Sequence, residues 1–155
     1  MANGAIGPFR GDPADEAAIA QENQSKDTLR RYYARVWNGR DVDAIDDLVA
    51  DDFVIHRDNQ VRKTKEGLKQ QVTETLGNFF ELRVHLEEMV ALRDVVAIRL
   101  NVWYRTSASG TPGDWVRMKG VDVSTVRDGR ITETAVRYSA PEIIPPDEAF
   151  KLLPP

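Results

Sequence analysis

Residues 120–139, GVDVSTVRDGRITETAVRYS, are the stretch that decides the fold of this chain. The run is rich in Val, Thr and Ile, and the pair Asp128-Gly129 interrupts it. Both central residues of a type I′ turn need a positive φ angle, which Asp-Gly pairs readily adopt. The pattern therefore predicts a β-hairpin, and the first strand of this hairpin carries a single carboxylate, Asp122.

Asp122 stands in a run of apolar and β-branched residues, where a charged side chain is unusual. Side chains alternate between the two faces of a strand, so Asp122 shares its face with Gly120, Ser124 and Val126. If that face is covered, the loss of water raises the pKa of Asp122 and makes it a candidate general acid or base. If that face is solvated, Asp122 is a surface aspartate. The alternation alone does not decide between these alternatives.

The hairpin is the end of a longer region with a period of two. Four strands are expected to form an antiparallel meander, at residues 80–92, 95–106, 115–127 and 130–139. Helical patterns precede them, at residues 25–39, after Asp41 and after Thr64, with a brief strand at residues 52–56. Helices followed by strands predict an α+β domain in which three N-terminal helices pack on a curved, mainly antiparallel sheet.

The composition narrows the possible partners. The chain has 155 residues, of which 41% are hydrophobic and 30% charged, and its net charge is -4. These values are typical of one globular domain without the basic stripe that nucleic acids require. No apolar run approaches the roughly 20 residues that span a bilayer, so we expect no membrane contact and a cytoplasmic location. With no cysteine and two histidines, no metal site is expected.

Three segments are expected along the chain. Residues 1–24 are rich in Gly, Ala and Pro near their start and predict a flexible arm or a short helix. Residues 25–140 form the folded domain. Residues 141–155 are a proline-rich tail with several apolar positions, which either packs across an opening or contacts a partner chain.

The first helix within the domain has a large aromatic face. Tyr33 and Trp37 lie one helical turn apart, and together they present an aromatic wall with a hydroxyl group at its edge. A buried tyrosine hydroxyl can donate to a developing enolate oxygen. Tyr32 is an equally good candidate for the inward position, and aromatic stripes of this kind often form plain core.

Three segments resemble the SnoaL-like polyketide cyclase branch of the nuclear-transport-factor-2-like (NTF2-like) superfamily. They are YYARVWNGRDVDAIDDLVADDFVIH at residues 32–56, RDVVAIRLNVWY at residues 93–104 and KGVDVSTVRDGRITE at residues 119–133. The resemblance implies a cone-shaped half-barrel around a mostly apolar pocket, with Asp122 inside, and a homodimer formed through the outer face of the sheet. The superfamily holds cyclases, ketosteroid isomerases, dehydratases, epoxide hydrolases, binding proteins and assembly domains, so the fold alone assigns no function.

The chain also departs from the family pattern after the Asp-Gly turn. Many relatives continue with Ile-x-Glu-x-Trp and an acidic residue four positions later. Ile131 and Glu133 match this pattern, whereas Ala135 stands at the Trp position and Ser139 at the acidic one. Because of this difference, the mechanism of the related epoxide hydrolases and standard cyclases is less readily carried over to this chain. Asp122 becomes the main candidate for a catalytic carboxylate.

The resemblance implies further pocket residues. His56 ends the brief strand at a position that faces the cavity in relatives, where an imidazole can bind a carbonyl or move a proton. The alternative is a partly buried histidine at a strand end. Arg99 and Asn101 project from one face of their strand, and in related hydrolases such a pair orients a catalytic acid. In the alternative, the opposite aliphatic face packs in the core and Arg99 lies at a dimer surface.

Large side chains on the strands complete the expected cavity wall. They are Tyr104, Trp115 and Met118, with Trp103 as a further candidate. His85 alternates out of phase with its aliphatic neighbours, so it is expected on the outer face of the sheet.

Taken with the resemblance, these residues predict a cofactor-independent, SnoaL-like cyclase that acts by acid/base proton transfer on a hydrophobic, carbonyl-bearing small molecule, polyketide-like or terpenoid-like. Asp122 moves the proton, and His56 or a tyrosine such as Tyr33 holds the enolate oxygen. Trp37 and Arg99 belong to the predicted substrate-binding set, with Asn101, Tyr104, Met118 and Trp115. The same residues would serve a ketosteroid-isomerase-like isomerase or a dehydratase. A non-catalytic ligand carrier or interaction module is the alternative from another class.

Overall fold

The structure is a computed structural model, and it describes residues 13–57, 60–108 and 111–154. The strands are β1 (Val49–Arg57), β2 (Gln60–Lys63), β3 (Glu81–Leu92), β4 (Val95–Arg105), β5 (Ser107–Ala108), β6 (Thr111–Pro112), β7 (Trp115–Arg127), β8 (Arg130–Tyr138) and β9 (Glu142–Ile144). The helices are α1 (Pro13–Tyr32), which continues as a π-helix over Tyr33–Asn38, α2 (Ile45–Leu48) after a 3-10 turn at Val42–Ala44, α3 (Lys65–Asn78) and α4 (Pro146–Leu152).

A curved seven-stranded sheet carries the fold, with the strand order β2-β1-β8-β7-β4-β3 and β9 beside β7, while β5 and β6 form a separate two-stranded sheet. The pairs β3·β4, β4·β7 and β7·β8 are antiparallel, which confirms the expected meander. The turn between β7 and β8 has φ angles of 51° at Asp128 and 72° at Gly129, as a type I′ turn requires. Because β1 runs parallel to β8, the sheet as a whole is mixed.

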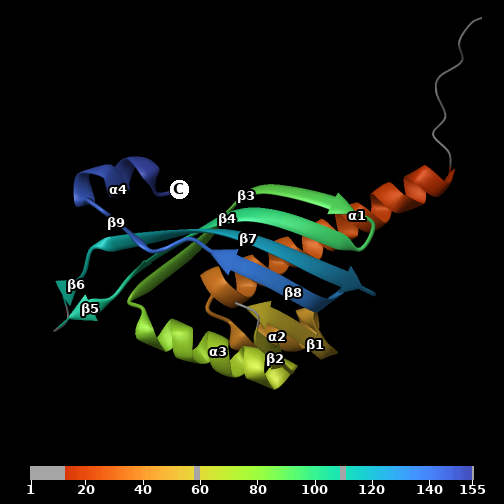
Figure 1. Ribbon diagram of the computed structural model, residues 1–155, viewed down its shortest axis with the longest axis horizontal. Coiled ribbons are helices and arrows are strands. Elements are labelled where there is room, and N and C mark those ends of the chain that lie inside the picture. The colour runs from red at the N-terminus through yellow and green to blue at the C-terminus, as the bar shows by residue number, and fades with distance from the viewer. Residues whose placement is uncertain (1–12, 58–59, 109–110, 155) are drawn as a thin grey trace, which may run out of the picture.

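The helices α1, α2 and α3 lie on one side of the curved sheet (Figure 1). Helix α3 begins where expected, because the Thr64 hydroxyl accepts a hydrogen bond from the N–H of Gly67 at 3.1 Å. Its apolar residues Leu68, Val72 and Leu76 are buried. The α+β class and the three N-terminal helices are thus confirmed, and α4 adds a helix that the proline-rich tail did not predict.

Helix α1 starts twelve residues before the expected domain boundary. It begins at Pro13, and its first buried residue is Ser25, so residue 25 marks where the helix meets the core and not where it begins. Figure 1 shows the first turns of α1 extending beyond the sheet. Residues 1–12, which make up half of the expected arm, lie outside the described part of the chain. Within the described part, no helix combines the length and the apolar character needed to cross a membrane.

The proline-rich tail folds back onto the sheet. Strand β9 pairs antiparallel with the start of β7, and α4 follows it. Ile144 and Ala149 from the tail form a small second core with Trp103, and Trp115 packs against this cluster. The tail therefore covers one end of the outer face, and it does not lie across the pocket described below.

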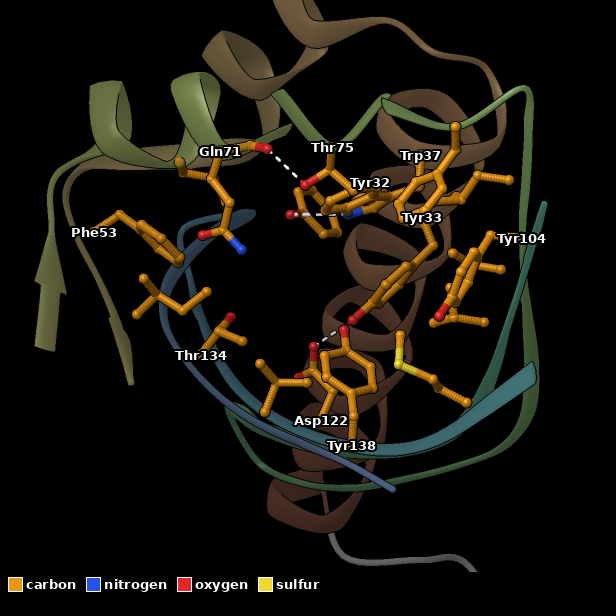
Figure 2. Close-up of a pocket in the computed structure, with 18 residues that line it drawn as sticks. Tyr32, Tyr33, Trp37, Phe53, Gln71, Thr75, Tyr104, Asp122, Thr134 and Tyr138 are labelled. Atoms are coloured by element: carbon orange, nitrogen blue, oxygen red, sulfur yellow. Dashed lines mark hydrogen bonds between the residues drawn. The ribbon is translucent and has the colours of Figure 1, made fainter. Parts of the chain in front are cut away.

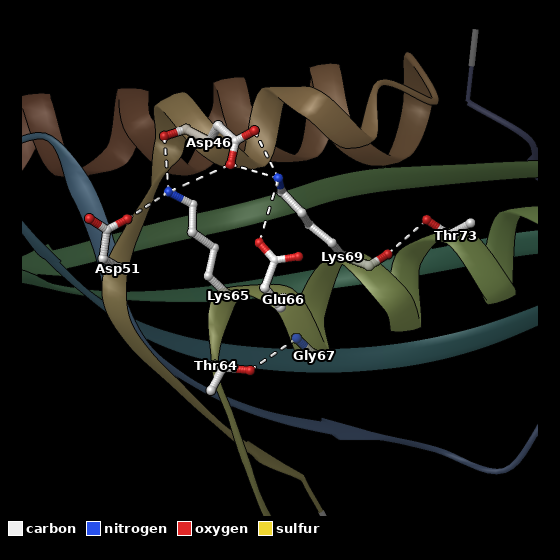
Figure 3. Close-up of polar contacts among 8 residues, drawn as sticks. All are labelled: Asp46, Asp51, Thr64, Lys65, Glu66, Gly67, Lys69 and Thr73. Atoms are coloured by element: carbon white, nitrogen blue, oxygen red, sulfur yellow. Dashed lines mark hydrogen bonds and ion pairs between the residues drawn. The ribbon is translucent and has the colours of Figure 1, made fainter.

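Surface ion pairs join α3 to the segment before it (Figure 3). The ammonium of Lys65 lies 3.0 Å from the carboxylate of Asp51, and that of Lys69 lies 2.7 Å from the carboxylate of Asp46. Hydrogen bonds from these lysines lower the pKa of both aspartates. Because the carboxylates are exposed, solvent screens these ion pairs and each contributes little to the stability of the fold.

Candidate functional site

A cavity of about 100 Å³ lies between the helices and the inner face of the sheet (Figure 2). This volume is on the scale of a single aromatic ring. Its wall is mainly apolar and aromatic, with a few polar groups. The lining residues are Tyr32, Tyr33, Trp37, Phe53, Ile55, Leu68, Gln71, Thr75, Phe79, Leu82, Val84, Val102, Tyr104, Met118, Asp122, Thr134, Val136 and Tyr138.

Asp122 projects from the middle of β7 into this cavity, with 1% of its surface exposed. The face that it shares with Gly120, Ser124 and Val126 is the covered face, because the helices pack on that side of the sheet. The sequence left this orientation open, and the resemblance favoured it. Asp122 is also the one carboxylate among the described residues that line the cavity.

Two hydroxyl groups hold the carboxyl group of Asp122. Tyr33 donates a hydrogen bond to Oδ2, and the Ser124 hydroxyl donates to Oδ1 at 2.6 Å. Ser124 also bonds the hydroxyl of Thr134 on β8, which lies directly opposite it in the sheet, at 2.8 Å. Burial raises the pKa of Asp122, while the hydrogen bonds from Ser124 and Tyr33 act in the opposite direction. The result is a desolvated but fixed carboxyl group.

The π-helix after α1 decides how the aromatic residues face the cavity. In this turn the N–H of Gly39 bonds the carbonyl of Ala34 at 2.8 Å, five residues back along the chain. The wider turn sets Tyr32 and Trp37 in register, and the Trp37 indole N–H donates to the Tyr32 hydroxyl at 3.2 Å. The sequence offered either Tyr32 or Tyr33 as the residue that faces inward. Both are buried and both line the cavity.

Burial also keeps the two tyrosines protonated. It raises the pKa of Tyr33 well above its ordinary value, and the nearby Asp122 carboxylate adds to this effect. Burial raises the pKa of Tyr32 as well, against the hydrogen bond from Trp37. Both hydroxyls are therefore hydrogen-bond donors at neutral pH.

The alternation of side chains along each strand decides which of the remaining predicted residues line the cavity. Tyr104 and Met118 line the cavity, as the sequence predicted. Trp115 does not, and this prediction was wrong, because an odd-numbered residue of β7 points away from the face that carries Met118 and Asp122. The Trp115 ring packs in the outer cluster with Trp103, and the Arg105 guanidinium lies 4.8 Å from its centre.

Arg99 and Asn101 lie on the outer face of β4, so their predicted place in the pocket was also wrong. Arg99 pairs with the carboxylates of Glu87 at 3.0 Å and Glu88 at 3.2 Å. The side-chain amide of Asn101 donates to Glu87 as well. The aliphatic residues of β4 fill the core from the opposite face, as the alternative for Arg99 required.

His56 also lies outside the cavity, in contrast to the prediction. Its neighbours Phe53 and Ile55 point inward and line the cavity, while His56 is 41% exposed at its side chain. Its Nε2 atom lies 2.9 Å from the carboxylate of Glu133 on β8. His85 is exposed on the outer face of β3, as expected.

Sequence reasoning missed four polar residues of the wall: Gln71, Thr75, Thr134 and Tyr138. A signal existed for the first two, because they fall on the apolar stripe of α3, where polar residues are unusual. Thr134 and Tyr138 could be found only from the register, which sets them opposite Ser124 and Gly120.

Gly120 makes room for Tyr138. A Cβ atom at residue 120 would lie 2.8 Å from the Tyr138 ring and 3.0 Å from the Leu100 side chain. With no side chain at this position, the ring crosses β7 and reaches the cavity beside Asp122 (Figure 2). Gly120, the first residue of the hairpin segment 120–139, thus shapes the site.

The lining residues set limits on the chemistry of the cavity. No lysine, arginine or histidine occurs among them, so within the described chain Asp122 has no cationic partner there. Nowhere in the described ranges do three or more His, Asp or Glu side chains gather in a way that could hold a metal ion. The wall offers one carboxyl group, four tyrosine hydroxyls, two threonine hydroxyls and the amide of Gln71, within an otherwise mainly apolar enclosure.

Comparisons with known proteins agree with this geometry. The protein-family model of the SnoaL-like domain matches residues 29–134 of this chain. No curated protein matches the chain in sequence. A candidate SnoaL-like polyketide cyclase from Jannaschia sp. CCS1 is 20% identical with a TM-score of 0.67, over 77% of this chain and 88% of that one. A candidate polyketide cyclase from Streptomyces antibioticus, IdmH, is 26% identical with a TM-score of 0.66, over 75% and 92%.

A third similar structure is SalBIII, an epoxide hydrolase/cyclase-like enzyme with a role in pyran ring formation in the polyether salinomycin. It is 21% identical with a TM-score of 0.68, and the match covers 79% of this chain and 98% of that chain. At this identity the likeness concerns the fold. The match to the domain model covers more than half of the chain and includes Tyr33, Asp122 and Thr134. The chain therefore belongs to the SnoaL-like domain family, within the NTF2-like superfamily.

Proposed function

We propose that this protein is a cofactor-independent cyclase that moves a proton next to a carbonyl group of a hydrophobic small molecule. One observation carries the proposal: a buried carboxyl group, Asp122, faces an apolar cavity and is held by the hydroxyls of Tyr33 and Ser124. A carboxylate with a raised pKa is a stronger base than a solvated one, and it is poised nearer to neutral pH.

In the first step, the Asp122 carboxylate takes a proton from the carbon next to the substrate carbonyl. The electrons of the broken C–H bond form an enolate, whose oxygen carries the negative charge. Tyr33 donates to Asp122, so it acts through that residue as a positioning group. The Tyr32 hydroxyl accepts from Trp37 and retains its own proton, so it is the better donor to the enolate oxygen.

In the second step, the enolate carbon attacks another carbonyl carbon of the same substrate and forms a carbon-carbon bond. The new alkoxide takes back the proton that Asp122 holds, so Asp122 ends the cycle ionised. The enclosed wall folds the substrate for this reaction, and such proximity contributes roughly 7 to 11 kcal/mol in well-oriented intramolecular reactions. A cavity of about 100 Å³ suits the reacting segment of a polyketide-like or terpenoid-like molecule.

The comparisons support a reaction of this class. IdmH is a candidate polyketide cyclase, and SalBIII takes part in forming a pyran ring. An isomerase or dehydratase would use the same first step and differ in where the proton returns. These reaction types stay predictions alongside the cyclase.

One observation also favours a ligand carrier. Both oxygens of Asp122 already accept hydrogen bonds, from Tyr33 and from Ser124, so the carboxyl group is satisfied without any substrate. A binding protein could hold a polar anchor in this way. The experiment below separates the two functions.

The test is deuterium exchange at the carbon next to a carbonyl, with acetophenone and 1-tetralone as probes in D₂O. We expect the wild-type protein to accelerate exchange and the Asp122→Asn variant to lose this acceleration by about 10²- to 10⁴-fold, the usual effect of a general base. Asp128→Asn is the matched control, because that aspartate lies in the exposed turn of the same hairpin and Asn tolerates its positive φ angle. A wild-type protein that binds these ketones without exchange would favour the carrier.

We also propose that two copies of the chain pair through the outer face of the sheet. Val121 and Val123 on β7 are 51% and 41% exposed, and with Val95 on β4 they form an apolar patch away from the tail. Apolar side chains exposed on one face of a sheet support the proposal of an interface there. The cytoplasmic location expected from the sequence stays a prediction.

A further inference from the structure

Gln71 brings a polar group into the cavity from the side opposite the sheet. It lies on α3, on the same stripe as the buried residues Leu68 and Val72. Figure 2 shows its amide group pointing into the cavity, with Asp122 across the open space on the sheet side. The cavity therefore has two polar ends, one at Asp122 and one at Gln71, with an apolar wall between them.

The amide oxygen of Gln71 is buried and accepts no hydrogen bond from any residue that the structure describes. Its neighbours do not satisfy it. The Thr75 hydroxyl donates to the backbone carbonyl of Gln71 at 2.8 Å, and the Thr134 hydroxyl pairs with Ser124. Buried acceptors in proteins are nearly always paired, so an acceptor left in a binding cavity indicates a ligand donor.

We propose that Gln71 is a specificity-determining residue that accepts a hydrogen bond from a hydroxyl group of the ligand. The ligand then carries a hydroxyl at the Gln71 end and, where the proposed function holds, its reacting carbonyl at the Asp122 end. This matches aromatic and polyketide-like compounds in which a phenol or enol hydroxyl stands across a ring from a carbonyl. A site built around such a bond rejects the analogue that lacks the hydroxyl, because the acceptor is then left unpaired.

Two probes that differ by this one group test the proposal: 4-hydroxyacetophenone and acetophenone. Their dissociation constants are measured by NMR titration, below the pKa of the phenol, with the wild type and with Gln71→Met, which keeps the length of the side chain and removes its polar atoms. We expect the wild type to bind the hydroxylated ketone about tenfold more tightly and Gln71→Met to bind both ketones equally. Acetophenone binding by the variant shows that its pocket is intact.

Gln70→Met is the matched control. Gln70 is the preceding residue of α3, is exposed and bonds Glu74 at 3.0 Å on the solvent side. This variant should keep the wild-type preference for the hydroxylated ketone. If the wild type shows no preference, including the case in which neither ketone binds, or if Gln71→Met retains the preference, the proposal is overturned.

Deuterium exchange on the same samples separates this inference from the proposed function. If Gln71→Met loses the preference while the wild type exchanges no deuterium, Gln71 recognises the ligand of a binding protein and the cyclase proposal fails alone. If exchange depends on Asp122 but the preference does not depend on Gln71, the inference fails and the proposed function stands.

Discussion

Asp122 combines a charge-bearing group with almost complete burial. Its carboxylate form is disfavoured by desolvation, and the hydroxyls of Ser124 and Tyr33 recover part of that cost. A surface aspartate in the same strand would carry no such penalty. The penalty makes Asp122 a useful base, and it also makes the stability of the fold depend on pH.

The sign of this dependence follows from the raised pKa. Between the unfolded value of about 3.9 and the native value, the folded chain holds a proton that the unfolded chain has released. The free energy of unfolding should therefore fall as the pH rises through this window, by about 1.4 kcal/mol per pH unit, and level off above the native pKa. Below the unfolded value both states are protonated, and Asp122 adds no pH dependence.

Urea unfolding of the wild type and Asp122→Asn from about pH 4 to about pH 8 checks this prediction. The free energy of unfolding of the wild type minus that of Asp122→Asn should fall as the pH rises, because the amide of the variant does not titrate. Asp128→Asn should track the wild type, since that aspartate lies in an exposed turn. A difference curve that is flat, or that rises with pH, would mean that the native pKa of Asp122 is not raised.

Among the secondary-structure elements, strand β9 and helix α4 pack over one end of the outer face of the sheet, and together they are called the C-terminal clamp. Strand β9 pairs with β7 at Trp115, Val116 and Arg117, and α4 closes over Trp103. Arg117 completes the cover, with its guanidinium 5.3 Å from the centre of the Trp103 ring. The tail is thus an integral part of the fold.

Two adjacent isoleucines of β9 offer a matched test of this clamp. Ile144 is 2% exposed and packs in the Trp103 cluster, whereas Ile143 is 68% exposed. Ile144→Ala should lower the free energy of unfolding by about 2 to 5 kcal/mol, and Ile143→Ala should change it by less than about 0.5 kcal/mol. Chemical denaturation measures both. Equal effects of the two substitutions would show that the tail does not pack as a clamp.

The whole molecule has a sheet with two different faces. The inner face carries the cavity and the helices, while the outer face is covered by the tail at one end and leaves Val121, Val123 and Val95 exposed. Arg99 with Glu87 and Glu88 borders this apolar area. A polar rim around an apolar centre is typical of a protein interface.

A single charge in this area should block the proposed association. We expect the wild type to sediment as a dimer and Val121→Lys as a monomer, because a lysine on each copy would have to lose water without a partner. Ile19→Lys is the control, since Ile19 is an equally exposed aliphatic residue on the first turns of α1. Analytical ultracentrifugation gives the masses. A monomeric wild type, or a dimeric Val121→Lys variant, would contradict the proposed interface.

Local patterns in the sequence were enough to predict most of the elements. The Asp128-Gly129 turn, the period of two after residue 80 and the Thr64 cap depend on neighbours within a few residues, and all three are confirmed. The family resemblance added the shape of the sheet and the place of Asp122. The sequence predicted an arm or a short helix over residues 1–24, and the structure has a helix from Pro13 that runs without a break into the predicted one at residue 25. The sequence did not show this continuity, because residues 13–24 are exposed and have little apolar periodicity.

The site itself depended on the tertiary structure. Alternation tells which residues share a face, but only the packing of the helices decides which face is covered. His56, Arg99 and Trp115 were therefore assigned to the wrong side. Each has the opposite parity to residues further along its own strand, or next to it, that do line the cavity. The polar end at Gln71 arises in the same way, because α3 and the sheet are far apart in the sequence and meet only when the chain folds.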